Sequence, residues 1–310
     1  MFSEHIAGFD RYHAMIVIGD LYVQERWELR KPLLTENESI GRRDSDIVSG
    51  TGAIVATIYS LVSKKPTRLI TVVGRDAVAQ RVREWNSTQQ FDLVPTIVAA
   101  RTGHGCRIAD VNGTIKCLIK DTTNNLLLSQ SMVQANINNW GEAVCVSLNM
   151  GTNTLQTVFE NAESFSALYI IGSHSPISNY HHLRASTILF LTVSQLTMLW
   201  GKKIESREDL SSALCQIAKL GIKTICALVS TSQVAIYSEN NVMWFGGELF
   251  RKEEELDDFI FGLYVGILIA RVESGKTLPI ACSELVEGRM LYEEGRVDEV
   301  EYLRALILHD

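Results

Sequence analysis

The sequence has few of the features that mark membrane, secreted or nucleic-acid-binding proteins. No apolar stretch reaches the ~18 residues that a membrane-spanning helix needs, and the first residues lack the basic and apolar regions of a signal peptide. No basic run is longer than two residues, as at Lys64-Lys65, and the net charge is -7. A chain of this charge repels polyanions. We therefore expect a cytoplasmic protein that binds neither nucleic acid nor membranes.

Several catalytic and metal-binding patterns are also absent. The six cysteines are scattered without a Cys-x-x-Cys pair, so we expect reduced, mostly buried thiols. No Walker sequence occurs, and the segment after Gly19 lacks the Gly-x-Gly-x-x-Gly of dinucleotide-binding folds. Ser173 has no Gly-x-Ser-x-Gly elbow, which argues against a hydrolase. The adjacent His181 and His182 would point to opposite faces of a strand, so we predict no metal site.

Strand and helix signals alternate over most of the length. Short apolar runs predict buried strands, and apolar residues at helical spacing predict the helices between them. This order indicates an α/β fold with a mostly parallel sheet covered by helices on both faces. Because no repeat, low-complexity tract or linker occurs, we expect one domain over residues 1–310. The predicted strands are 15–19, 69–73, 143–148, 167–171, 187–191 and 224–229, and the predicted helices are 53–62, 76–85, 154–162, 194–199, 207–220, 255–272, 279–293 and a short one after 298.

Two segments interrupt this alternation. Residues 21–48 form a polar connection that is too long for an ordinary loop between a strand and a helix, and a small β lid or a partner surface would explain its length. Residues 93–120 contain short β runs, with a hairpin signal at Val111-Asn112-Gly113. We predict that both segments contribute lid strands or hairpins. Strands at 234–237 and 242–245 are expected to form a meander.

Short motifs follow one another along nearly the whole chain. The first are Val17-Ile-Gly-Asp20, Gly50-Thr-Gly-Ala-Ile-Val-Ala56 and Val73-Gly-Arg-Asp76. Thr102 and Arg107 then fit a T-x-x-x-x-R strand, and Leu256 to Gly262 fits the end of G-A-G-D-A-F-x-x-G. In this order the motifs resemble the ribokinase-like, PfkB-type carbohydrate kinases, with the heptose-phosphate kinase domain as the closest likeness. The resemblance implies a three-layer sandwich with a small β lid.

The resemblance also implies roles for individual residues. In that family an aspartate at the start of a late helix acts as general base on the sugar hydroxyl, and Asp257 matches it. The implied substrate-binding residues are Asp20, Gln24, Gly50, Thr51 and Arg107. The implied nucleotide- and phosphate-binding residues are Thr192, Gln195, Ser230 and Ser232. An active member would use ATP and Mg²⁺ to phosphorylate a sugar hydroxyl.

The phosphate and metal positions depart from the family's pattern. Glu254, Glu255 and Leu256 stand where the G-A-G turn should offer bare backbone amides to a phosphate. A like charge at about 4 Å costs on the order of 4 kcal/mol at an effective dielectric constant near 20, and one lost oxyanion donor costs roughly 3 to 4 kcal/mol. The metal-organising N-x-x-E reads Thr192 and Gln195, which removes the carboxylate that Mg²⁺ prefers.

The sugar and nucleotide positions depart as well. Gln24 replaces the sugar-binding aspartate after the first strand, and Ile54 replaces the asparagine that follows the glycine pair. The T-x-G-x-x-G nucleotide turn reads Ser230-Thr-Ser-Gln-Val-Ala235. Losses at the sugar, metal, phosphate and nucleotide positions together indicate that phosphoryl transfer is under relaxed selection.

Three hypotheses stay open. The first is a catalytically inactive pseudokinase that serves a binding, regulatory or assembly role. The second is an active ATP-dependent carbohydrate kinase that uses Asp257 and an atypical phosphate site. The third is a sensor that binds a sugar or a nucleotide without turnover. Kinases of this group often pair through their lids, so we expect by analogy a homodimer that forms through the lid segment.

Overall fold

The computed structural model describes residues 15–30, 41–111, 115–137, 142–172, 180–247, 250 and 256–293, which form two sheets and the helices around them. The strands of the large sheet are β1 (Met15–Ile18), β4 (Thr67–Val73), β5 (Asp92–Ile97), β8 (Ala143–Ser147), β9 (Ala167–Ile171), β10 (Ile188–Thr192), β11 (Thr224–Ser230), β12 (Gln233–Ser238) and β13 (Asn241–Gly246). Their order is β13-β12-β11-β10-β9-β8-β1-β4-β5. The pairs from β5 across to β11 are parallel, whereas β12 pairs antiparallel with β11 and β13.

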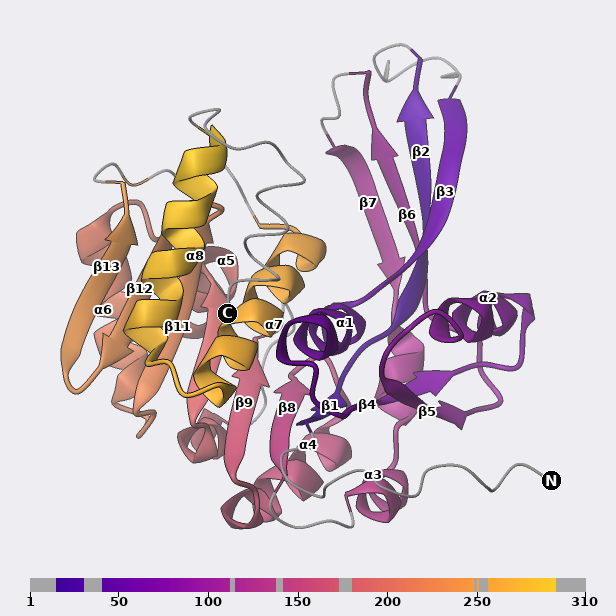
Figure 1. Cartoon of the computed structure of the whole chain (residues 1–310), viewed down its shortest axis with the longest axis horizontal. Helices are drawn as coiled ribbons and strands as arrows, with labels where there is room; N and C mark the ends of the chain where they lie inside the picture. The colour runs from indigo at the N-terminus through magenta and orange to yellow at the C-terminus, as the bar shows by residue number, and fades with distance from the viewer. Residues whose placement is uncertain are drawn as a thin grey trace.

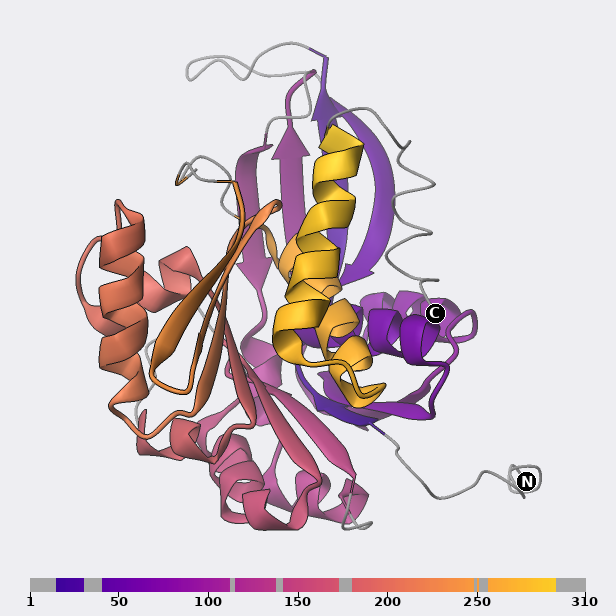
Figure 2. The ribbon, with the colours of Figure 1, turned by 60° about the vertical axis from the view of Figure 1, so that its left-hand side comes forward.

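Helices cover both faces of this sheet (Figures 1 and 2). They are α1 (Thr51–Ser63), α2 (Ala77–Asn86), α3 (Gln130–Asn136), α4 (Thr152–Glu160), α5 (Val193–Trp200), α6 (Arg207–Ala218), α7 (Asp258–Glu273) and α8 (Leu278–Glu293). Apolar side chains of α1, α2, α7 and α8 form one core with the sheet, and those of α3 to α6 form a second core on the other face. The predicted α/β sandwich with a mostly parallel sheet and helices on both faces is therefore confirmed. No helix in the described part of the chain is both long and apolar enough to cross a membrane.

Helices α1 and α7 pack closely because α7 presents glycines to α1. A Cβ atom on Gly262 would lie 3.0 Å from the Ile54 side chain, and one on Gly266 would lie 2.9 Å from the Ile58 side chain. Both isoleucines are buried. The glycines let these side chains lie directly on the backbone of α7. Since the contacts advance in the same direction along both helices, the N-termini of α1 and α7 lie on the same side of the molecule.

A second sheet rises from one side of the molecule (Figure 1). Its strands are β2 (Tyr22–Leu29), β3 (Gly41–Ser49), β6 (His104–Ala109) and β7 (Ile115–Asp121), in the order β3-β2-β6-β7. The central pair β2 and β6 is parallel, and the two outer pairs are antiparallel. We call these four strands the lid sheet. Described parts of the segments 21–48 and 93–120 thus form the lid sheet.

Strand β5 differs from the expectation for residues 93–120, because it is not part of the lid sheet. It pairs in parallel with β4 and forms an edge of the large sheet. Most of its side chains are partly or fully exposed, which is typical of an edge strand in either sheet and does not reveal which one it joins. The hairpin tip at 112–114 and the helix predicted after 298 lie outside the described residues.

Candidate functional site

The candidate site lies at the carboxyl edge of the parallel strands, where the lid sheet meets the N-termini of α1 and α7. Strand β1 is followed by Gly19 and then by Asp20, whose side chain is buried. The two carboxylate oxygens of Asp20 accept hydrogen bonds from the N–H groups of Thr51 (3.1 Å) and Gly52 (3.3 Å). The first amides of a helix have no partner within the helix, and the helix dipole favours an anion there. Asp20, an implied substrate-binding residue, therefore caps α1.

The glycines at this position are required by close backbone contacts. Gly50 precedes α1 with a φ angle of 109°, and a Cβ atom on it would lie 2.5 Å from the carbonyl oxygen of Asp20. A Cβ atom on Gly19 would lie 2.6 Å from the Cα atom of Gly52, and the reverse contact is equally short. Such contacts need residues without a side chain. The glycine pair of the sequence motif thus allows α1 to start against the turn that leaves β1.

Burial gives Asp20 a pH-dependent effect on stability. Desolvation, and then the charge of Asp258, raise the pKa of the Asp20 carboxyl above its ordinary value, although backbone hydrogen bonds oppose the change. The folded state therefore holds this proton more tightly than the unfolded state. The resulting stability is complete below the unfolded pKa of about 3.9 and is lost as the pH rises through the raised folded pKa.

We expect the Asp20→Asn variant to gain stability relative to the wild type as the pH rises from about 4 to about 8, because the amide carries no charge to desolvate. Urea denaturation of both proteins at several pH values measures this difference. The net rise of the Asp20 pKa already includes its backbone hydrogen bonds, so the change of the difference with pH is the informative quantity. A difference that does not change with pH would contradict this account of Asp20.

Asp257, the implied general base, directly precedes α7. Its Oδ1 atom accepts a hydrogen bond from the N–H group of Ile260 at 2.8 Å, so it is the N-cap of the helix. The next residue, Asp258, accepts from Lys120 Nζ at 2.5 Å, which joins the end of β7 to the start of α7. Burial, and then the charge of Asp258, raise the pKa of Tyr22 on β2. Asp257 thus stabilises the start of α7 as its N-cap, and its role as a general base stays a prediction.

Thr192 and Gln195, at the implied metal-organising positions, bind each other at the start of α5. The Thr192 hydroxyl accepts from the Gln195 N–H group (3.3 Å), and Gln195 Oε1 accepts from the Thr192 N–H group (3.0 Å). This reciprocal arrangement is a capping box, and both side chains are buried. Gln195 Oε1 also occupies the space that a Cβ atom on Gly172 would take. The two side chains therefore serve the helix end and offer no carboxylate.

Ser230 and Ser232 lie at the connection between β11 and β12. Strand β12 starts at Gln233, which pairs with Ser230, so Thr231 and Ser232 are the two-residue loop of a β-hairpin. Ser230 Oγ accepts from the Ser232 N–H group at 3.3 Å. Tyr264 of α7 donates its hydroxyl to the Thr231 carbonyl oxygen at 2.8 Å. The implied nucleotide positions Ser230 and Ser232 therefore lie at this hairpin, and their role stays a prediction.

An apolar pocket of about 360 Å³ opens at the ends of β10 and β11. Phe250 and Leu256 line it together with residues of α5. Leu256 is buried and belongs to the core on the α7 side of the sheet. It directly precedes Asp257 and holds the place of the last glycine of the implied phosphate turn. Glu254 and Glu255, the other departures in that turn, lie outside the described residues.

The lid sheet contributes Gln24 and Arg107 to the implied substrate site. Gln24 is buried in β2 and is the register partner of Gly105 in β6. Two residues further on, Arg26 is the register partner of Arg107. Burial, and then Arg107, lower the pKa of Arg26, while the charge of Asp257 opposes this change. Arg26 therefore lies within electrostatic reach of α7. The resemblance did not point to it, although alternation along β2 places it on the same face as Gln24.

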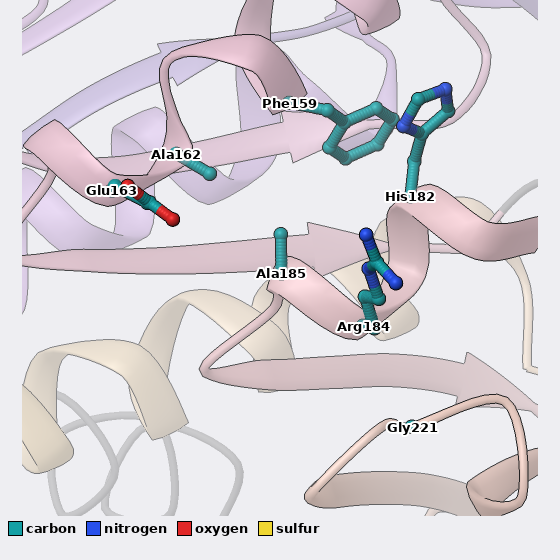
Figure 3. A pocket seen from close by; sticks show the side chains of 7 residues that line it. All are labelled: Phe159, Ala162, Glu163, His182, Arg184, Ala185 and Gly221. Atoms are coloured by element: carbon teal, nitrogen blue, oxygen red, sulfur yellow. The ribbon is translucent and has the colours of Figure 1, made fainter.

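A further cavity, of about 490 Å³, lies at the opposite edge of the large sheet (Figure 3). Its walls come from residues that precede β9, β10 and β11, which are the amino ends of parallel strands. The ring of His182 stacks on Phe159 with 5.1 Å between centroids, and the exposed Glu163 and Arg184 line the same cavity. Since ligands of open α/β sheets bind at the carboxyl ends of the strands, we assign the candidate site to the other edge.

The implied site residues form two groups at that carboxyl edge. The first group surrounds the N-termini of α1 and α7 and the facing lid sheet, and consists of Asp20, Gln24, Gly50, Thr51, Arg107 and Asp257. The second lies at the ends of the neighbouring strands β10 and β11, and consists of Thr192, Gln195, Ser230 and Ser232. Leu256 connects them, because it lines the pocket of the second group and directly precedes Asp257 of the first.

Comparison with known proteins shows a likeness in structure. No protein-family model and no curated protein matches the sequence. The ribokinase of Thermotoga maritima is 14% identical, with a TM-score of 0.76 over 96% of this chain and 100% of that one. A carbohydrate kinase from Agrobacterium tumefaciens is 16% identical, with a TM-score of 0.70 over 95% and 97% of the two chains. The adenosine kinase of Anopheles gambiae, solved with P1,P4-di(adenosine-5) tetraphosphate, is 13% identical, with a TM-score of 0.70 over 90% and 95%.

Identities this low establish the fold and leave the substrate open. The expected likeness to the heptose-phosphate kinase domain stays a prediction. The matches to these two structures extend over nearly the whole chain. The chain therefore has the fold of the ribokinase-like carbohydrate and nucleoside kinases.

Proposed function

We propose that this chain is a catalytically inactive protein on a ribokinase-like scaffold, with a binding, regulatory or assembly role. The observation that carries the proposal is the position of Leu256, which is 6% exposed and joins the core next to α7. A phosphate held at a helix start needs open amides within hydrogen-bond distance. A buried leucine directly before the N-cap instead brings apolar surface to that place. The neighbouring pocket suits an apolar group better than a polyphosphate.

The residues that would hold Mg²⁺ and a nucleotide do not fit those groups either. A hard cation prefers carboxylate and carbonyl oxygens, whereas Thr192 and Gln195 have no carboxylate, and the side-chain oxygens of both already make the capping box. At the nucleotide position, a two-residue hairpin loop connects β11 to β12. We therefore derive no phosphoryl-transfer step for this chain.

The alternative is an active ATP-dependent carbohydrate kinase with ATP and Mg²⁺ as cofactors. One observation favours it, which is that Asp257 keeps the place of the general base at the start of α7. The adenosine kinase of Anopheles gambiae, which has the same fold, was solved with a dinucleoside tetraphosphate. The third hypothesis, a sensor that binds a sugar or a nucleotide without turnover, is compatible with the proposed inactive scaffold.

We expect Mg·ATP and Mg·ADP to leave the melting temperature of the protein unchanged. A ligand present at 100 times its Kd would stabilise the native state by about 2.7 kcal/mol, so binding would be visible in a thermal-shift titration. We also expect no ATP consumption above buffer with a panel of sugars and nucleosides. The control is Asp257→Asn, which keeps a side-chain oxygen for the helix cap. Sugar-dependent ATP consumption that disappears in this variant would establish the active kinase and refute the proposal.

The homodimer through the lid sheet also stays a proposal. Strand β7 is an outer strand of that sheet, and its Leu118 and Ile119 are exposed. Unpaired strand edges with exposed apolar side chains are frequent sites of association. Both features support the lid sheet as the surface through which two copies would meet.

A further inference from the structure

The cavity at the amino edge of the large sheet (Figure 3) is separate from the candidate site. None of the residues that line it belongs to the two groups of implied site residues. Its walls come largely from the end of α4 and from two short 3₁₀ helices, η2 (Ala162–Ser164) and η3 (Tyr180–Ala185). Its volume of about 490 Å³ is within the range of pockets that hold small molecules. A ligand in this cavity would therefore have a site of its own.

Two charged side chains of opposite sign line this cavity. Glu163 of η2 and Arg184 of η3 are both exposed. Within the described part of the chain neither side chain forms a hydrogen bond or an ion pair, so they do not pair with each other. Figure 3 shows the Glu163 carboxylate and the Arg184 guanidinium group on the two sides of Ala185. The cavity thus offers one acceptor group and one donor group to a molecule placed between them.

Two stacked rings form another wall of the cavity. The His182 ring lies on the Phe159 ring with 5.1 Å between centroids and 8° between planes, and both residues are partly exposed. The neighbouring Ala162 and Ala185 have small side chains, which leave room beside the rings. Aromatic surfaces of this kind pack well against another ring or a bulky apolar group. The cavity therefore combines two charges with an apolar wall.

The two charges favour a zwitterion over other small ligands. An anion would be attracted by Arg184 and repelled by Glu163, and a cation would meet the reverse. A neutral ligand would remove water from both charged groups without replacing its hydrogen bonds. A molecule with one carboxylate and one ammonium group satisfies both, because the guanidinium fork matches a carboxylate and the carboxylate of Glu163 accepts from an ammonium group.

We propose that this cavity binds a free α-amino acid with an aromatic or large apolar side chain. The α-carboxylate of the ligand pairs with Arg184, and its α-ammonium group pairs with Glu163. The side chain of the ligand packs against the stacked rings. A peptide carries its two terminal charges at opposite ends and therefore does not match the cavity in the same way. The inference goes beyond the proposed function, because it adds a ligand that binds away from the carboxyl edge of the sheet and undergoes no reaction.

Titration of the full chain at constant ionic strength, without Mg²⁺ or nucleotide, tests the site. The probes are L-phenylalanine, L-leucine and glycine, together with phenylalaninamide, which lacks the carboxylate, and N-acetyl-phenylalanine, which lacks the ammonium group. We expect saturable binding of phenylalanine and leucine by calorimetry, and none of glycine or of the two derivatives. Absence of saturable binding of both amino acids would overturn the proposal. Equal binding of phenylalanine and its amide would also overturn it.

Variants assign the binding to the cavity. We expect Arg184→Gln and Glu163→Gln each to weaken phenylalanine binding about 10-fold or more, the effect of one lost charge-assisted hydrogen-bonding group. The matched controls are Arg42→Gln on β3 and Glu287→Gln on α8, which remove the same charges from exposed positions elsewhere. Both controls should leave the affinity unchanged. Equal affinity in the wild type and in either cavity variant would refute the site.

Filling the cavity tests the site without a change of charge. Ala185 is exposed and lies between the two charged groups in Figure 3, so the ring in Ala185→Phe would occupy the space beside them. We expect this variant to lose phenylalanine binding and to keep the melting temperature of the wild type, since a substitution at an exposed position changes stability little. Retained binding would place the amino acid elsewhere, against the proposal.

The stability of the ligand-free proteins separates a binding role from a structural one. Neither Glu163 nor Arg184 has a side-chain partner in the described part of the chain, so Glu163→Gln and Arg184→Gln should melt at the wild-type temperature without ligand. Lower melting temperatures in both variants would show that the two charges stabilise the fold, against the proposal. The outcome with Mg·ATP is independent: turnover would refute the inactive scaffold, while phenylalanine binding would still support this site.

Discussion

Replacing Gly52 by valine is expected to lower the free energy of unfolding by about 3 kcal/mol, at the upper end of the usual range for overpacking. A Cβ atom at this position would lie 2.6 Å from Gly19 Cα, 2.8 Å from Gly19 C and 2.9 Å from Asp20 N. These are backbone atoms, which cannot rotate away as a side chain could. The start of α1 and the turn after β1 would have to separate, and the cap that Asp20 provides would be lost with them. Urea denaturation followed by circular dichroism measures the loss.

The matched control for this prediction is Gly247→Val. Gly247 is exposed, and the nearest atom to a Cβ on it is Gln233 Nε2 at an ordinary contact distance of 3.7 Å. A surface substitution of this kind changes stability by about 0.5 kcal/mol or less. If both variants lost the same small amount, the close crossing of β1 and α1 would not be a constraint on the fold.

Ile54→Asn is expected to destabilise the protein by about 3 to 4 kcal/mol. Ile54 is 5% exposed, belongs to the core on the α7 side and lies directly over Gly262. Asparagine would lose part of the apolar burial and place an amide in apolar surroundings without a partner. In an active sugar kinase of this fold, the resemblance places an asparagine at this position for a substrate hydroxyl. The loss of unfolding free energy in Ile54→Asn therefore shows whether this position now serves packing rather than a substrate hydroxyl.

Ile54→Val provides the reference, with an expected loss of about 1 kcal/mol from one missing methylene group. Equilibrium denaturation of the three proteins gives the comparison directly. An asparagine variant that is as stable as the valine variant, and that is stabilised further by a sugar, would show a polar site at the start of α1. That outcome would contradict the packing described for Ile54 and Gly262.

The strands of the large sheet could be predicted because they are buried on both faces. Residues 143–147 and 167–171, for example, are almost continuously apolar, and such runs between helical segments indicate a parallel sheet. The helices between them follow from apolar spacing. Helix α3, with seven residues, was not predicted, since so short a segment carries little periodicity.

The strands of the lid sheet carry a weaker signal. Tyr22–Leu29 mixes apolar residues with a polar and charged stretch in its middle, which also fits a polar loop, so the sequence predicts an extra structural unit without its pairing. The edge strand β5 has a similar mixed pattern and was assigned to the wrong sheet. Strand pairing depends on contacts between distant parts of the chain, which local patterns do not encode.

For the candidate site, the sequence shows which residue types changed but not what structural contacts those residues make. The resemblance gives Asp257 as a general base, whereas its hydrogen bond from the Ile260 N–H group shows that it caps α7. For Thr192 and Gln195 the sequence shows the loss of a carboxylate, whereas the capping box appears only once both backbone amides are in place. Arg26 was missed because its importance comes from its neighbour in β6, Arg107, which is far away in the sequence.

The most direct test of the inactive-scaffold account is a crystal structure determined with Mg²⁺ and a non-hydrolysable ATP analogue at saturating concentration. We predict that no triphosphate will be found on the amides at the start of α7, and that Leu256 will stay packed in the core. A structure with the β- and γ-phosphates bound to those amides beside Asp257, and with Leu256 displaced, would contradict the account.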